Sequence, residues 1–241
     1  MKVYALTDIG LMRALNEDAC YVPAEGERFC AVADGMGGHN AGEVASAMAV
    51  EVFSRQMRGV ENIDAEALRS AVVDANEAVF RKSLENASMS GMGTTFSALA
   101  ELEDGVAIAH VGDSRVYLIR DGRITQVTTD HTLVESMVRQ GMITAREARV
   151  HPQRNMITRA LGTEPEVDVD LIELERMPDD VFFLCSDGLS GYVEDEDILR
   201  ILNGEGRWEE KLYELVDMAL DAGGSDNITV MVAVFKEDVS R

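Results

Sequence analysis

The chain contains few of the residues that would cross-link it, anchor it in a membrane or attract polyanions. Its three cysteines, Cys20, Cys30 and Cys185, are scattered and form no CxxC pair, which argues against a disulfide framework and a zinc knuckle. No apolar run approaches the roughly 18 residues of a membrane helix. The N-terminal stretch contains acidic residues and lacks the apolar block of a secretory signal. These absences predict a cytoplasmic protein without a membrane span.

Basic side chains are also scarce. The chain has 22 Lys and Arg against 44 Asp and Glu, and its formal net charge is −22. This balance disfavours nucleic acid and anionic membranes as partners. An anionic phosphate substrate remains compatible with it, because bound divalent cations dominate the field inside a metal site.

The 241 residues include no repeat, no low-complexity run and no linker rich in Pro, Gly or Ser, so we expect one domain over residues 1–241. Apolar patterning predicts strands at 2–8, 28–33, 93–101, 105–111, 114–120, 167–175, 181–186 and 227–235. Helices are expected to open at 39–43 and to span about 64–84, 195–202 and 208–221. Blocks of strands between helix pairs favour an α+β fold with mostly antiparallel sheets covered by helices.

Local turn and cap signals refine this picture. Asp121-Gly122 is a two-residue hairpin signal. From 130 to 161 the chain becomes polar and helical, and Thr144-x-x-Glu147 is the pattern of a capping box.

Three aspartates stand at the ends of strongly apolar stretches: Asp34 after FCAVA, Asp187 after VFFLCS and Asp226 before NITVMVAVF. Separated carboxylates with little nearby His or Cys are suited to a hard, six-coordinate cation such as Mg²⁺ or Mn²⁺. Gly35 and Gly188 follow two of them, and we expect each glycine to let the chain turn sharply and to free a carbonyl for the metal. If the aspartates meet, the chain carries a metal centre that hydrolyses phosphate esters.

Further motifs occur in a fixed order along the chain: Arg13-Ala-Leu-Asn16-Glu17-Asp18, Asp34-Gly-Met-Gly-Gly-His39, Gly112-Asp113-Ser-Arg115, Cys185-Ser-Asp187-Gly188 and Gly224-Ser-Asp226-Asn-Ile-Thr229. With this ordered set, the chain resembles the metal-dependent serine/threonine protein phosphatases of the PPM (type 2C) family in its compact bacterial form. The resemblance covers about Lys2 to Phe235. It implies two packed antiparallel sheets between helix layers, an α/β/β/α sandwich.

The resemblance also implies roles for these residues. Asp34 would bridge two metal ions, the Gly35 carbonyl would complete the second ion's shell, and Asp187 and Asp226 would bind the first ion. Asp113 would hold a weaker third ion with Asp187, or it serves only as a turn residue. Glu17 and Asp18 form an acidic pair near the second ion, and the sequence leaves open which of them acts.

Two residues would handle the phosphate and the leaving group. Arg13 would hold the substrate phosphate through its planar donor fork, or it is a surface ion-pair residue. His39 would protonate the leaving alkoxide, or it is a helix-entry residue that hydrogen-bonds locally. Paired Mn²⁺ or Mg²⁺ ions would lower the pKa of a shared water, so that hydroxide attacks phosphorus directly.

The sequence therefore favours a monomeric phosphatase that acts on phosphoserine and phosphothreonine proteins, opposes a protein kinase and recognises substrates through a mobile flap at about 131–160. Two alternatives stay open. One is a catalytically silent module that binds phosphoproteins. The other is a phosphatase for an anti-sigma antagonist or a small phosphate ester. A cysteine phosphatase is excluded, because no cysteine begins a Cys-x₅-Arg motif, and no P-loop occurs.

Overall fold

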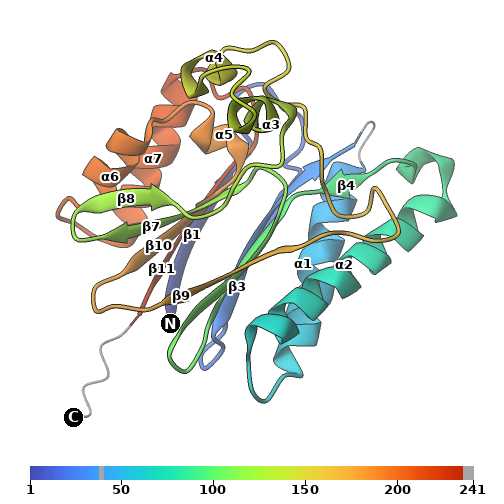
Figure 1. Ribbon diagram of the computed structural model, residues 1–241, viewed down its shortest axis with the longest axis horizontal. Helices are drawn as coiled ribbons and strands as arrows, with labels where there is room; N and C mark the ends of the chain where they lie inside the picture. The colour runs from blue at the N-terminus through green and yellow to red at the C-terminus, as the bar shows by residue number, and fades with distance from the viewer. Residues whose placement is uncertain (38–40, 236–241) are drawn as a thin grey trace.

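The computed structural model describes residues 1–37 and 41–235. Two antiparallel sheets pack face to face between two layers of helices (Figure 1). The five-stranded sheet has the order β1 (Lys2–Asp8), β11 (Ile228–Val234), β10 (Val181–Cys185), β7 (Arg115–Arg120) and β8 (Arg123–Gln126). The six-stranded sheet has the order β2 (Asp18–Tyr21), β3 (Phe29–Met36), β5 (Phe96–Glu101), β6 (Gly105–Val111) and β9 (Asp170–Glu175), and β4 (Gly93–Thr94) pairs with β3.

Helices cover the outer faces of both sheets (Figure 1). Helices α1 (Gly42–Arg58) and α2 (Ala65–Glu85) pack on the six-stranded sheet, and the short 3-10 helix η1 (Ala87–Met89) follows them. Helices α6 (Asp195–Leu202) and α7 (Trp208–Asp221) pack on the five-stranded sheet. Helices α3 (Leu133–Arg139) and α4 (Ala145–Arg149) belong to the predicted flap segment, and α5 (Asp187–Ser190) follows β10 directly.

The core between the sheets explains why central strands are apolar at nearly every position. Val32 and Ile108 from one sheet meet Phe182 and Met231 from the other, and all four side chains are fully buried. The alternate residues of the same strands face the helices, as Phe183 does beneath α6 and α7. A strand that is buried on both faces needs no polar face. The predicted α+β sandwich is therefore confirmed.

Most expected elements are present, with four differences at the strands. Strand β2 was not predicted, because its four residues are only half buried and give little apolar signal. The run 93–101 is divided into β4 and β5, and β9 begins at Asp170 rather than at 167. Strand β3 continues through Asp34 to Met36 instead of ending at 33.

Both short-range signals are confirmed. Asp121 and Gly122 have positive φ angles of 51° and 71° and join the paired residues Arg120 and Arg123. At α4 the Thr144 side chain accepts from the Glu147 backbone N–H, and the Glu147 carboxylate accepts from the Thr144 N–H at 2.7 Å. Within 1–37 and 41–235, no helix combines the length and the apolar character needed to cross a bilayer.

Candidate metal centre

Five aspartates from both sheets gather at one edge of the sandwich. Asp18 opens β2 and stands directly opposite Asp34 in the β2–β3 ladder. Asp187 follows β10, and Asp226 precedes the antiparallel neighbour β11, so both lie at the same sheet edge. Asp113 lies in the turn where the chain crosses from β6 to β7, that is, from one sheet to the other. The fold thus brings together residues that are far apart in the sequence.

The carboxylates repel one another in a setting with little water. Burial raises the pKa of Asp34 well above its usual range, and the charges of Asp18 and Asp187 raise it further. Burial likewise raises the pKa of Asp18 to about 7, and burial together with the Asp226 charge raises the pKa of Asp187 to about 6. The pKa of Asp113 is raised by burial and by Asp187. Concentrated negative charge of this kind calls for a cation.

The donor set fits a hard divalent ion. One oxygen each of Asp18 and Asp113, Oδ1 in both, is buried without a hydrogen-bond partner in the described part of the chain. Buried polar atoms are rarely left unpaired, and oxygen ligands are those that Mg²⁺ and Mn²⁺ prefer. Among the described residues, no three acidic, His or Cys side chains already form a group able to hold an ion.

Arg13 lies at the mouth of this cluster. Its Nη2 donates to Asp226 Oδ2 at 2.8 Å, and its Nη1 lies 3.5 Å from Glu17 Oε2. The Arg13 side chain is 44% exposed, so its remaining donors face solvent. A guanidinium held by one edge at the rim of an acidic site can offer its other donors to an incoming phosphate.

The glycines after two of the aspartates lie at close backbone contacts that the sequence did not suggest. Gly35 lies inside β3 and makes no sharp turn. A Cβ there would meet the Gly42 carbonyl oxygen at 2.2 Å and the Glu17 carbonyl oxygen at 2.4 Å. A Cβ on Gly188 would meet the Asn227 carbonyl oxygen at 2.0 Å. The expectation of a turn was wrong at Gly35, because the strand continues there, whereas Gly188 lies where the chain passes from β10 into α5. At both positions the backbones approach too closely for any side chain.

Two polar residues of the site were missed from the sequence. Ser186 donates its Oγ–H to Asp18 Oδ2 at 2.8 Å and accepts from the Thr229 backbone N–H at 2.9 Å. Asn227, 2% exposed, accepts from the Glu17 N–H and donates to the carbonyls of Ile9 and Leu15. It thereby fixes the 9–17 loop that carries Arg13. Their positions beside Asp187 and Asp226 were the available signal.

The histidines are placed as follows. His39 lies outside the described residues. His110 is fully buried, and burial lowers its pKa to about 4, as befits a core histidine. His131 packs against the Gly112 backbone beside Asp113.

A family model described as protein phosphatase 2C matches residues 13–231. The chain belongs to the protein phosphatase 2C family. It is 42% identical over 234 residues, 97% of its length, to the serine/threonine protein phosphatase PstP of Mycobacterium tuberculosis. It spans 45% of that relative's length, so it corresponds to about half of the longer protein.

Solved structures of serine/threonine phosphatases superpose closely on this one. Staphylococcus aureus Stp1 has a TM-score of 0.91 at 38% identity, with 97% of this chain and 94% of that chain covered. The catalytic domain of PstP, solved in complex with two manganese ions, has a TM-score of 0.87 at 40% identity, with 96% of each chain covered.

Proposed function

We propose that this phosphatase 2C family member is a serine/threonine protein phosphatase that depends on Mn²⁺ or Mg²⁺. The observation that carries the proposal is the convergence of five aspartates from two sheets, one buried and four partly buried, beneath an arginine at the rim. The names of the relatives agree with it, and the PstP catalytic domain was solved with two manganese ions.

The individual roles follow the sequence prediction. Asp34, at the centre of the cluster, is proposed to bridge two ions, with the Gly35 carbonyl in the shell of the second. Asp187 and Asp226 are proposed to bind the first ion. Asp113 is proposed to serve a third ion, and its buried, unpartnered Oδ1 supports that assignment.

The structure favours different positions for the two members of the acidic pair. Asp18 is buried, with one oxygen held by Ser186 and the other unpaired, so it is suited to approach the ions. Glu17 lies nearer the rim beside Arg13 and over the start of α1, where Gly42 offers it a backbone N–H.

When bound, the paired ions supply an activated water and neutralise the charge that builds up at phosphorus. The chain itself orients the substrate phosphate and holds the ions in place. Arg13 binds two phosphate oxygens through its fork, and the buried aspartates keep the ions fixed while Ser186 holds Asp18 in place. His39 remains proposed as the donor of a proton to the departing alkoxide oxygen.

The proposed substrates are phosphoserine and phosphothreonine proteins, among them a protein kinase that this enzyme opposes. We further propose a cytoplasmic monomer whose flap at 131–160 selects substrates. The three free cysteines of the described chain agree with a reducing compartment.

A phosphopeptide assay tests the function. Turnover of phosphothreonine peptide should require Mn²⁺ or Mg²⁺, should stop with chelator, and should fall by at least about 100-fold in Asp34→Asn. Asp217→Asn, at an exposed position of α7, is the matched control and should retain full activity. Tight phosphopeptide binding without turnover would instead support the silent binding module, and turnover confined to small phosphate esters would support the other alternative.

The role of Asp113 is tested separately. Asp113→Ala should lower turnover while the wild-type affinity of the two tighter ions is kept, as measured by Mn²⁺ titration calorimetry. Unchanged turnover would make Asp113 a structural turn residue.

A further inference from the structure

His131 connects the proposed third-ion aspartate to the base of the flap segment. Its backbone N–H donates to the Gly112 carbonyl at 2.7 Å, and its ring Nδ1 accepts from the Gly112 N–H at 3.0 Å. A single residue thus pairs with both backbone groups of Gly112, next to Asp113. Gly112 adopts a φ of +109°, and a Cβ there would lie 2.6 Å from Thr95, so this turn has little freedom of its own.

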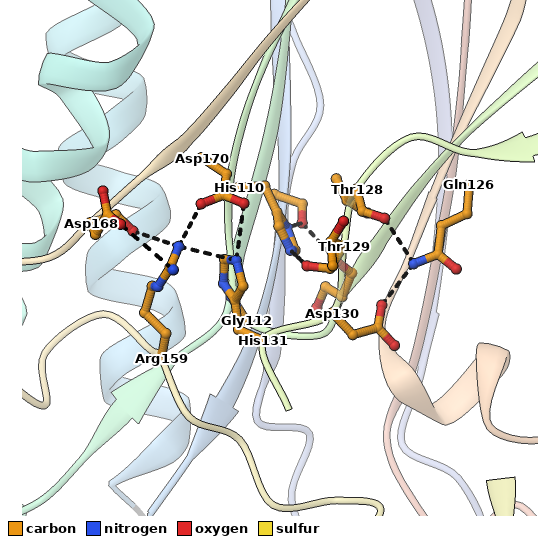
Figure 2. Close-up of polar contacts among 12 residues, drawn as sticks. His110, Gly112, Gln126, Thr128, Thr129, Asp130, His131, Arg159, Asp168 and Asp170 are labelled. Atoms are coloured by element: carbon orange, nitrogen blue, oxygen red, sulfur yellow. Dashed lines mark hydrogen bonds and ion pairs between the residues drawn. The ribbon is translucent and has the colours of Figure 1, made fainter. Parts of the chain in front are cut away.

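The hydrogen-bond partners fix the tautomer of His131. Because the Gly112 N–H can only donate, Nδ1 must be the unprotonated nitrogen. The proton therefore lies on Nε2, which faces Asp170 Oδ2 at 3.2 Å and lies 3.0 Å from Arg159 Nη1 (Figure 2). Because a protonated Nε2 cannot accept from Nη1, both nitrogens are donors that share the Asp170 carboxylate. Arg159 approaches the same carboxylate, with its Nη1 donating to Asp170 Oδ1 at 2.5 Å. Asp170 thus joins the His131 ring to Arg159.

These contacts also close the two ends of the flap segment. The His131 carbonyl accepts from the Thr158 N–H at 2.8 Å, and Thr132 pairs with Ile157 in an isolated bridge. Arg159 follows immediately and also donates to the Asp168 carbonyl at 3.1 Å. His131 and Arg159, at the two ends of the flap segment, therefore both contact Asp170 at the start of β9.

We propose that His131 and Asp170 act together as positioning residues with two separable functions. The Nδ1 side holds the Gly112–Asp113 turn and so sets how tightly Asp113 binds a divalent ion. The Nε2 side, through Asp170, holds the base of the flap segment. The first function rests on the proposed role of Asp113 in the phosphatase, and neither function makes His131 a catalytic residue.

Two substitutions separate the functions. The amide oxygen of Asn in His131→Asn can replace Nδ1 as the acceptor for the Gly112 N–H, but it removes the Nε2–H donor to Asp170 Oδ2 and leaves Arg159 as the donor to this carboxylate. The amide of Gln in His131→Gln reaches the Nε2 position and keeps Asp170, but it leaves the Gly112 N–H unpaired. His131→Gln should therefore weaken the weakest Mn²⁺ site by about tenfold, as measured by calorimetry on the full chain without substrate.

His131→Asn and Asp170→Asn should keep that Mn²⁺ affinity within about threefold and should instead speed limited proteolysis within 133–157. His151→Gln, in the same segment, is the matched control and should change neither readout. Equal Mn²⁺ affinity in His131→Gln and His131→Asn overturns the proposal. If His131→Gln fails to fold, the double variant His131→Asn/Asp170→Asn decides, because additive effects on proteolysis would show that the two residues do not act together.

If the proposed phosphatase function itself is wrong, the experiments give a different result. In that case the wild-type chain binds no Mn²⁺ or turns over no phosphopeptide, whatever the variants do.

Discussion

The proposed role of Arg13 combines an ion pair at the rim of the site with phosphate binding. In this structure its guanidinium pairs with Asp226, which is itself a proposed metal ligand. An ion bound by Asp226 would compete for that carboxylate and leave the Arg13 fork free for phosphate. The sequence alone left open a surface ion pair for Arg13, and the structure shows an ion pair that belongs to the site.

Arg13→Lys should therefore raise the KM for phosphopeptide about tenfold or more, because a lysine ammonium cannot hold two phosphate oxygens in a planar fork. Mn²⁺ affinity, measured by calorimetry, should stay within about twofold, because lysine keeps the positive charge that competes with the ion for Asp226. Steady-state kinetics at saturating Mn²⁺ provide the comparison. A variant with unchanged KM and weakened Mn²⁺ binding would show that Arg13 positions the metal-binding carboxylates rather than the phosphate, and would contradict the assignment.

Asn227 is the residue on which the position of Arg13 depends. Asn227→Ala should lower the free energy of unfolding by about 1–3 kcal/mol, because it removes the partner of three partly buried backbone groups of the 9–17 loop. Phosphopeptide turnover should fall with it. Chemical denaturation measures the first effect, and Asn203→Ala, at the exposed end of α6, is the control. A loss of stability no greater than in Asn203→Ala would show that the loop does not need Asn227.

At the level of elements, α4 shows what a local sequence pattern can predict. The capping box at Thr144 could be predicted from four residues of sequence, because both of its hydrogen bonds are local. Helix α4 has only five residues and buries none of them, so its cap supplies a large part of its stability. Its loss should affect the flap segment and leave the sandwich intact.

Thr144→Ala should therefore cost α4 about 0.5–2 kcal/mol of local stability with little change in the global melting temperature. Amide hydrogen exchange should rise at 145–149 and remain unchanged in β10 and β11. Thr163→Ala, at an exposed threonine beyond the segment, serves as control. A drop in the melting temperature together with faster exchange in the central strands would mean that α4 supports the core.

Strands with fully buried residues were predicted from the sequence, whereas a strand with half-buried residues was missed. β10 and β11 were legible because both faces are apolar, whereas β2 is a half-buried edge strand and was missed. Because β2 was missing from the prediction, the pairing of Asp18 with Asp34 was not foreseen. The choice between Glu17 and Asp18 therefore could not be made from the sequence. That choice needed the ladder between β2 and β3, which is a tertiary fact.

At the scale of the whole molecule, the site exists because two sheets end at the same edge. The order of motifs predicted which aspartates would meet, and their meeting is the property of the sandwich rather than of any segment. The glycines show the same limit. Gly35 and Gly188 were correctly singled out, yet the reason, backbones in close approach from distant elements, is invisible in a local pattern.

The concentration of buried acids gives the whole protein an unusual dependence on pH. In the metal-free protein the pKa values of Asp18, Asp34 and Asp113 lie above those of unfolded carboxyls, chiefly through burial. A raised carboxyl pKa means that the folded state binds more protons than the unfolded state, so stability falls as pH rises through the folded pKa. His110, with its lowered pKa, opposes this trend only below about pH 6.5.

Between pH 6.5 and 8.5 the metal-free protein should therefore lose stability, and its melting temperature should fall by about 3 °C or more. Saturating Mn²⁺ should raise the melting temperature more at pH 8.5 than at pH 6.5, because the ion replaces the protons that hold the carboxylates together. Differential scanning calorimetry in chelator and in Mn²⁺ gives both curves. A metal-free melting temperature that rises across this window would mean that the carboxylates are not crowded, and the metal centre would lose its electrostatic basis.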